Sequence, residues 1–295
     1  MEDSESYENN DGSETESEFD WFCWNENSCR YDSFITVFTL GLYKKYNNFN
    51  IPNIDRRNKF NNQYISLCNL AEKMPSNISS KLIMDFWDEM WRTGVDDKKP
   101  GTMGYVQELL NLILPLFDLQ PFIELEKNCD YCKFETKEKV RYPLPLQIHE
   151  FGELKYNSIQ NYFDWILEKI GDHCEVCFEK KLNSIFNIHK DPDFIFIEFI
   201  PIQNSKQKSK IKNDATLFNK KNNSKFQIIA TINNPTPLHF NYSIFEPRNI
   251  FNQQSILLEG WYLHDGVQNN GRLVKLDSVK EIWKEKPIIL IYKKE

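Results

Sequence analysis

The sequence predicts an α+β protein with an antiparallel sheet. Helical spacing of apolar residues dominates the chain up to Leu119. Short alternating or apolar runs follow, with one further helical pattern among them. Helices followed by strand after strand are typical of this fold class. With 295 residues, 40% of them apolar, the chain can bury a large core, so we expect one elaborated domain over residues 21–295.

Four segments of the first part carry helical spacing. In the first, which begins at Cys29, Phe34, Val37, Phe38 and Leu42 fall on one stripe. Its expected N-cap is Asn27 or Ser28. The other three are YISLCNLAEKM at 64–74, SSKLIMDFWDEMWR at 79–92 and GYVQELLNLILPLF at 104–117.

The second part is expected to be mostly strands, with one helix at SIQNYFDWILEKI, residues 158–170. The strand-like runs are KVRYPLPLQIHE at 139–150, DFIFIEFIPI at 193–202, KFQIIATI at 225–232, SILLEGWYLHD at 255–265 and PIILIYK at 287–293.

The first 20 residues form an acidic tract, with nine Asp and Glu and no Lys or Arg. It has too few apolar groups to offset the entropy of ordering, so we expect residues 1–20 to be a disordered, solvated tail. Removing its nine acids from the net charge of −7 leaves the rest of the chain near +2. That charge does not supply the basic face that nucleic-acid binding needs, so no nucleic-acid partner is expected.

Residues 203–225 are rich in lysine, with seven Lys against one Asp. One interpretation is a nucleic-acid patch, but aromatic residues for base stacking are not regularly interleaved with the charges. We therefore expect a long lysine-rich surface loop between two strands.

No apolar run approaches the roughly 18 residues of a membrane span, and the amino terminus is acidic. We expect a cytoplasmic or nuclear monomer that does not bind membranes. Its seven cysteines are then expected to be reduced and to serve as metal ligands or catalysts.

Four of the cysteines form two Cys-x-x-Cys pairs, CDYC at Cys129 and Cys132 and CEVC at Cys174 and Cys177. Two such loops can present four sulfurs tetrahedrally to one zinc ion, so we predict one structural zinc. The 41 residues between the pairs exceed the spacing of a zinc ribbon and must form strands and a helix of their own. His173, beside the second pair, is an alternative ligand.

Cys29 lies where a helix is predicted to begin, after the small polar residues of NENS. Unpaired backbone N–H groups and the positive end of the helix dipole favour a thiolate there. Cys29 is therefore the candidate nucleophile, and an ordinary buried thiol is the alternative. Cys23, before the helix, and Cys68, in an apolar stripe, are expected to be core or surface thiols.

A thiol nucleophile needs a base, and His239 is the best placed of the five histidines. It follows a proline-containing turn at the start of a strand-like run, where a rigid sheet can aim the imidazole. Asp265, 26 residues later at a strand end, can accept the imidazole N–H and fix its tautomer. His264 would face the opposite side of that strand and is the weaker candidate.

The order of these features resembles the ubiquitin-specific proteases, a family of papain-like cysteine peptidases. ENSC at 26–29 resembles the family's Gly-Asn-Thr-Cys box, and DSF at 32–34 resembles its Asn-Ser-Leu continuation. LHF at 238–240 resembles the Gly-His-Tyr box, with Leu238 in place of the glycine, and WYLHD at 261–265 resembles the Trp-x-x-Phe-Asp box. Three further runs match in order: PLPLQI, DFIFIEFIPI with Glu198 where the family has a basic pair, and KPIILIYKK.

The resemblance implies a papain-like fold with a helical thumb (21–119), zinc-binding fingers (120–185) and an antiparallel-sheet palm (186–295). It implies a catalytic triad of Cys29, His239 and Asp265. The family's oxyanion-hole asparagine lies a few residues before the cysteine; here Trp24 takes that place, and Asn25 is the candidate donor beside the Cys29 backbone N–H.

The activity implied by the resemblance is deubiquitination, in which the thiolate attacks the isopeptide carbonyl after the modifier's C-terminus. The implied partner is ubiquitin or a ubiquitin-like modifier on its conjugates. Three alternatives remain: an isopeptidase for SUMO or another modifier, a catalytically weak ubiquitin-binding relative, and an unrelated zinc-dependent binding module.

Overall fold

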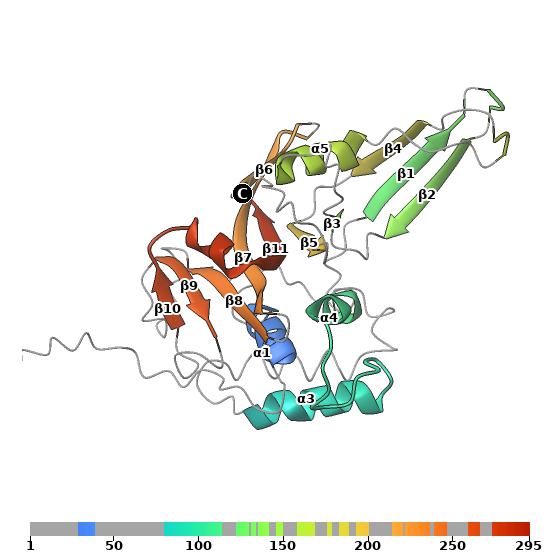
Figure 1. The fold of residues 1–295 in the computed structure, drawn as a ribbon. Coiled ribbons are helices and arrows are strands. Elements are labelled where there is room, and N and C mark those ends of the chain that lie inside the picture. Colours follow the sequence, from blue (N-terminus) through green and yellow to red (C-terminus); the bar gives the residue numbers. More distant parts are fainter. Residues whose placement is uncertain are drawn as a thin grey trace, which may run out of the picture.

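The computed structural model describes residues 29–38, 80–113, 122–129, 131–133, 135–141, 146–149, 158–168, 176–178, 183–188, 193–200, 214–220, 222–236, 239–246, 259–265 and 273–295. Within them the chain is a mixed α and β protein with a large, mainly antiparallel sheet (Figure 1). This confirms the predicted α+β class. The acidic tract 1–20, the helix expected at 64–74, Asn25, Cys23 and Cys68 lie outside the described residues.

The helices lie where the apolar spacing predicts them. They are α1 (Cys29–Thr36), α3 (Ser80–Arg92), α4 (Val106–Ile113) and α5 (Ile159–Glu168). A short 3₁₀ helix, η5 (Glu281–Glu285), lies near the end of the chain, where the sequence predicts no helix. None of the described helices is both long enough and apolar enough to cross a membrane.

The larger sheet has eight strands. Their order is β10-β9-β8-β7-β11-β5-β3, and β6 pairs with β7 outside this path. The strands are β3 (Leu146–His149), β5 (Phe194–Ile200), β6 (Thr216–Asn219), β7 (Ser224–Thr236), β8 (His239–Glu246), β9 (Gly260–His264), β10 (Leu273–Leu276) and β11 (Pro287–Lys294). All of these pairings are antiparallel except that of β3 with β5. A parallel pair needs a long crossover, which the chain between β3 and β5, including α5, provides.

The central strands are buried on both faces because helices cover both sides of the sheet. Along β5, Phe194 and Phe196 join the core that contains α1, α3 and α4. Ile195 and Ile197 alternate with them and join a second core with Ile159 of α5. This period of two explains why DFIFIEFIPI reads as a nearly continuous apolar run.

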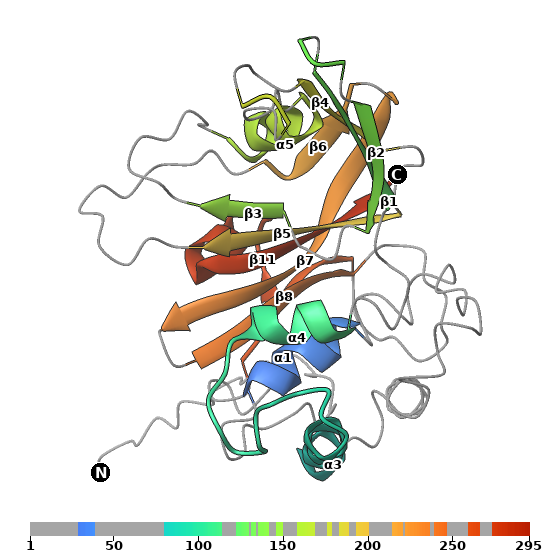
Figure 2. The same ribbon diagram turned by 90° about the vertical axis from the view of Figure 1, so that its right-hand side faces the viewer.

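The first helix, α1, is enclosed on all sides. It contacts β8, α3 and α4, and Figure 2 shows α1 and α4 next to β8, with α3 farther from the sheet. Every residue from 29 to 38 is buried, including Arg30, Asp32 and Ser33. The sequence predicts a single apolar stripe here. The buried charged and polar residues instead require specific partners inside the protein.

A smaller three-stranded sheet lies at the far end of the molecule from α3 (Figures 1 and 2). Its order is β2-β1-β4, with β1 (Phe122–Asn128), β2 (Glu135–Arg141) and β4 (Asn183–Ile188). The segment expected for the zinc-binding part, 120–185, therefore divides between two sheets, because β3 lies in the larger one. KVRYPLPLQIHE likewise supplies two strands, β2 and β3, with Pro143 and Pro145 between them.

The lysine-rich tract does not run as a loop over its whole length. Its second half forms β6 and the start of β7, a hairpin in which Asn219 pairs with Ser224. Leu217 of β6 is buried opposite its register partner Phe226 of β7, so burial of this apolar pair, and not the lysines, decides the local structure. Asn223 takes the positive φ of 52° that the turn requires, a conformation that asparagine tolerates well. Residues 203–213 lie outside the described part.

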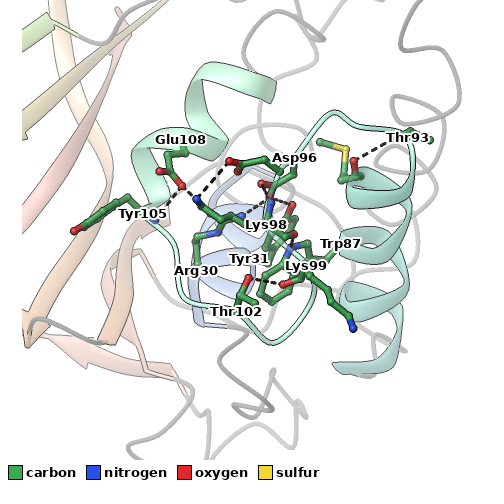
Figure 3. Close-up of polar contacts among 12 residues, drawn as sticks. Arg30, Tyr31, Trp87, Thr93, Asp96, Lys98, Lys99, Thr102, Tyr105 and Glu108 are labelled. Carbon is green, nitrogen blue, oxygen red and sulfur yellow. Dashed lines mark hydrogen bonds and ion pairs between the residues drawn. The ribbon is translucent and has the colours of Figure 1, made fainter.

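The buried guanidinium of Arg30 fixes α1 to the connection between α3 and α4 (Figure 3). It forms an ion pair with Asp96, and its Nη1 donates to Glu108 Oε2 at 3.1 Å. Asp96 also accepts a hydrogen bond of 2.6 Å from the Tyr31 hydroxyl. The guanidinium carbon lies 5.1 Å and 5.5 Å from the ring centroids of Tyr31 and Trp87, which stack on each other. Because Arg30 follows Cys29 directly, this cluster holds the first turn of the helix.

Replacing Asp96 with alanine is expected to lower the free energy of unfolding by about 3 kcal/mol, because it leaves the Arg30 charge buried with one partner fewer. Denaturant unfolding measures the change. Asp97→Ala is the matched control: its side chain is 81% exposed, so we expect a change below about 0.5 kcal/mol. An equal fall in the free energy of unfolding in the two variants would show that the buried Arg30 charge is not stabilised by Asp96.

Candidate active site

Cys29 is the first residue of α1 and is buried between this helix and its neighbours. Its backbone lies in the first turn, where N–H groups have no acceptor within the helix. The residues expected as N-cap, Asn27 and Ser28, and the candidate oxyanion donor Asn25 lie outside the described residues.

The pairing of β8 with β9 brings His239 and Asp265 together. Tyr242 of β8 lies opposite His264 of β9, so continuing this antiparallel register places Asp265 opposite Asn241. His239 lies two residues before Asn241 and therefore on the same face of the sheet, diagonal to Asp265. The imidazole Nε2 is 2.8 Å from Asp265 Oδ1. The His239 side chain is 15% exposed and that of Asp265 is 3% exposed, so the carboxylate is shielded while the imidazole is partly accessible.

The surroundings of His239 favour its protonated form. Its hydrogen bond to Asp265 is the main cause that raises the pKa of His239 to about 9, and a hydrogen bond to the Cys29 side chain is the second. Partial burial acts in the opposite direction. Since Nε2 faces Asp265, Nδ1 is the ring nitrogen left for the thiol. Near neutral pH the imidazole is therefore a cation between a carboxylate and a cysteine.

His264, the weaker candidate for the base, faces away from this group. It is buried, and its ring stacks on Tyr242 with the centroids 4.8 Å apart. Since His264 precedes Asp265 in the strand, its side chain points to the other face.

Sequence reasoning missed three polar residues beside the site: Asn233, Asn241 and Glu285. Asn241 Nδ2 lies 3.4 Å from Asp265 Oδ2 and 3.2 Å from Glu285 Oε2, and Asn233 Nδ2 donates to Asn241 Oδ1 at 2.8 Å. The one available signal is Asn241 inside the strand-like run that begins at His239, where asparagine is disfavoured; Asn233 lies just beyond the run KFQIIATI.

Three of the four paired cysteines form a cluster at one end of the smaller sheet. Cys129 follows the end of β1, Cys132 precedes β2, and Cys177 precedes β4. Because Asn128 pairs with both Glu135 and Asn183, the three segments meet at that end. The three sulfurs lie within 4.8 Å of one another and can hold a metal ion. Cys174 and the alternative ligand His173 lie outside the described residues.

Both cysteine pairs are followed by a residue in the left-handed backbone conformation. The residue after the second cysteine has a positive φ in each, 56° at Lys133 and 57° at Phe178, which is uncommon for side chains of this kind. Backbone N–H groups in the first loop, chiefly that of Cys132, donate to the sulfur of Cys129 and lower its pKa to about 7. A lowered thiol pKa favours the thiolate form that binds metals.

No model of a known protein family matches the chain, and no curated protein matches it either. A cysteine at a helix start, in contact with an imidazole whose other nitrogen faces a carboxylate, has the components of a thiol nucleophile with an oriented acid and base. The cysteine cluster lies in a separate sheet and has the donor chemistry of a metal site.

Proposed function

We propose that the protein is a cysteine isopeptidase that removes ubiquitin, or a ubiquitin-like modifier, from its conjugates. The observation that carries this proposal is the contact of His239 with both Asp265 and Cys29. The resemblance of the cysteine, histidine and aspartate boxes to those of ubiquitin-specific proteases supplies the substrate class.

The proposed reaction is acyl transfer through Cys29. The thiolate sulfur forms a bond to the isopeptide carbonyl carbon, the bond from that carbon to the lysine nitrogen breaks, and the His239 imidazolium gives its proton to the departing amine. Neutral His239 then takes a proton from water, whose oxygen bonds to the acyl carbon as the bond from that carbon to sulfur breaks. This restores the thiolate and the imidazolium and releases the modifier's carboxylic acid, which loses its proton to solvent. Asp265 holds the imidazole orientation through both steps. Backbone N–H groups at the start of α1 are suited to stabilise the oxyanion.

We assign a papain-like architecture on the same basis. The helices α1, α3 and α4 would form the thumb, the larger sheet the palm, and β1, β2 and β4 the fingers. The supporting observation is that Cys29 comes from the helical side and His239 and Asp265 from the sheet. In this arrangement the modifier's body would rest on palm and fingers, and its tail would enter between thumb and palm.

Fluorogenic ubiquitin and SUMO substrates test the activity and the modifier together. Cys29→Ala should abolish turnover, and His239→Ala should nearly do so, because each removes a group that takes part in the bond changes. Asp265→Ala should cost about 10²-fold to 10⁴-fold, because the acid only orients the imidazole. Cys68→Ala, a control outside the described residues, should keep wild-type turnover. Binding of ubiquitin without turnover by the wild type would favour the catalytically weak relative.

For the cysteine cluster we propose structural zinc. Four sulfurs around a zinc ion with bonds of about 2.3 Å lie about 3.8 Å apart, and the Cys129 and Cys177 sulfurs are 3.7 Å apart. Cys174 would be the fourth ligand. Four thiolates leave no position for a reacting water, so the metal would hold the smaller sheet together and take no part in the reaction.

Metal analysis of the purified protein is expected to find about one zinc per chain. Cys177→Ser should lose the metal and much of the soluble yield, because metal binding and folding of this region are coupled. Tyr131→Ala is the matched control: it changes an exposed residue of the Cys129 loop, 60% accessible, that offers no sulfur. Absence of zinc from a folded wild-type protein would end the proposal.

A further inference from the structure

A row of buried polar side chains crosses three strands behind the candidate site. Asn233 of β7 pairs directly with Asn241 of β8, and the register of β8 on β9 continues the row to Asp265. All three residues are buried. Asparagine is disfavoured inside strands, and a buried amide is costly unless it is hydrogen-bonded. The row therefore depends on specific partners.

The hydrogen bonds of the row have one consistent direction. Carboxylates only accept, so the group that Asn241 turns toward Asp265 and Glu285 must be its NH₂. Its carbonyl oxygen then accepts from Asn233 Nδ2 at 2.8 Å. The oxygen of Asn233 in turn accepts from the Thr231 hydroxyl at 2.8 Å. The acidic groups at one end thus determine the orientation of each amide along the row.

One amide serves two carboxylates. Asn241 Nδ2 lies 3.4 Å from Asp265 Oδ2 and 3.2 Å from Glu285 Oε2. Without a donor between them, the buried Asp265 carboxylate and the partly buried Glu285 carboxylate would repel each other. The other oxygen of Asp265, Oδ1, is the one that faces His239 Nε2. Holding Oδ2 toward Asn241 therefore also sets the direction of Oδ1.

We propose that Asn241 is a positioning residue, which holds the Asp265 carboxylate in the orientation that contacts His239. This inference rests on the proposed isopeptidase function for its catalytic consequence. Asn241 acts through Asp265 and does not touch the reacting atoms. Asn233 and Glu285 support it by occupying its remaining hydrogen-bonding groups.

The test is an NMR titration of the His239 imidazole in the full-length protein and in Asn241→Leu, which keeps the side-chain size but has no donor. The main cause that raises the pKa of His239 to about 9 is its bond to Asp265, so loosening that carboxylate should lower the pKa by about one unit. Turnover should fall about tenfold at an unchanged KM, as expected for a small misplacement of a catalytic group. If Asn241→Leu does not fold, the same titration of Asn241→Ala, which also has no side-chain donor, decides the question.

Ser243→Ala is the matched control. Ser243 lies on the same strand and face, is equally buried, and accepts from Asn233 at 3.3 Å. We expect this variant to leave the pKa of His239 unchanged. An unchanged pKa in the Asn241 variants, or an equal fall in Ser243→Ala, would overturn the assignment.

The two readouts separate this inference from the proposed function. The titration needs no substrate, so a fall in the His239 pKa in the Asn241 variants supports positioning even if the wild type cleaves no modifier. The contrasting result is that the wild type cleaves the modifier while Asn241→Leu shows the same turnover and the same His239 pKa. That result would support the isopeptidase function and contradict the positioning role of Asn241.

Discussion

The antiparallel register of β8 on β9 is the constraint on which the candidate site depends. Tyr242 opposite His264 places Asp265 on the same face as His239 and turns the His264 ring to the other side. Because side chains alternate with a period of two, a slip of one residue would turn the carboxylate away from the imidazole. The stacked, buried pair of Tyr242 and His264 resists such a slip, so packing on one face of the sheet stabilises the polar contacts on the other.

A second constraint positions the cysteine. The helix that begins at Cys29 is buried on every side, and the Arg30 charge next to it is matched by Asp96 and Glu108. A buried ion pair contributes little net stability, but breaking it is costly, so it selects one position of the helix over others. The site thus combines a helix fixed by charge pairing with a sheet fixed by register. Both carry buried polar residues that an ordinary core would not contain.

Local patterns predict much of the fold. Helices α3 and α5 and strands β5, β7 and β11 lie where the apolar spacing places them, because each period can be read over a few residues. The parallel pairing of β3 could not be predicted, since it depends on where a long crossover returns. The prediction of a loop is wrong for the second half of the lysine-rich tract, because β6 is only four residues long and its neighbours are charged.

The candidate site could be predicted only in part. His239 and Asp265 follow from their positions at strand ends, but the roles of Asn241 and Glu285 depend on how the strands pair. The positive φ at Lys133 and Phe178 could not be predicted, because glycine, the residue that usually indicates this conformation, is absent from both positions.

The most direct measurement of whether Cys29 is the nucleophile is the position of a covalent adduct. The full-length protein is incubated with ubiquitin and SUMO that carry a C-terminal propargyl group, digested, and analysed by mass spectrometry. We predict a modified Cys29 peptide with at least one of the two probes, and its near absence in His239→Ala, because the attack requires the oriented imidazole. An adduct on Cys23 or Cys68, or undiminished labelling of Cys29→Ala, would contradict the assignment of the nucleophile to the first turn of α1.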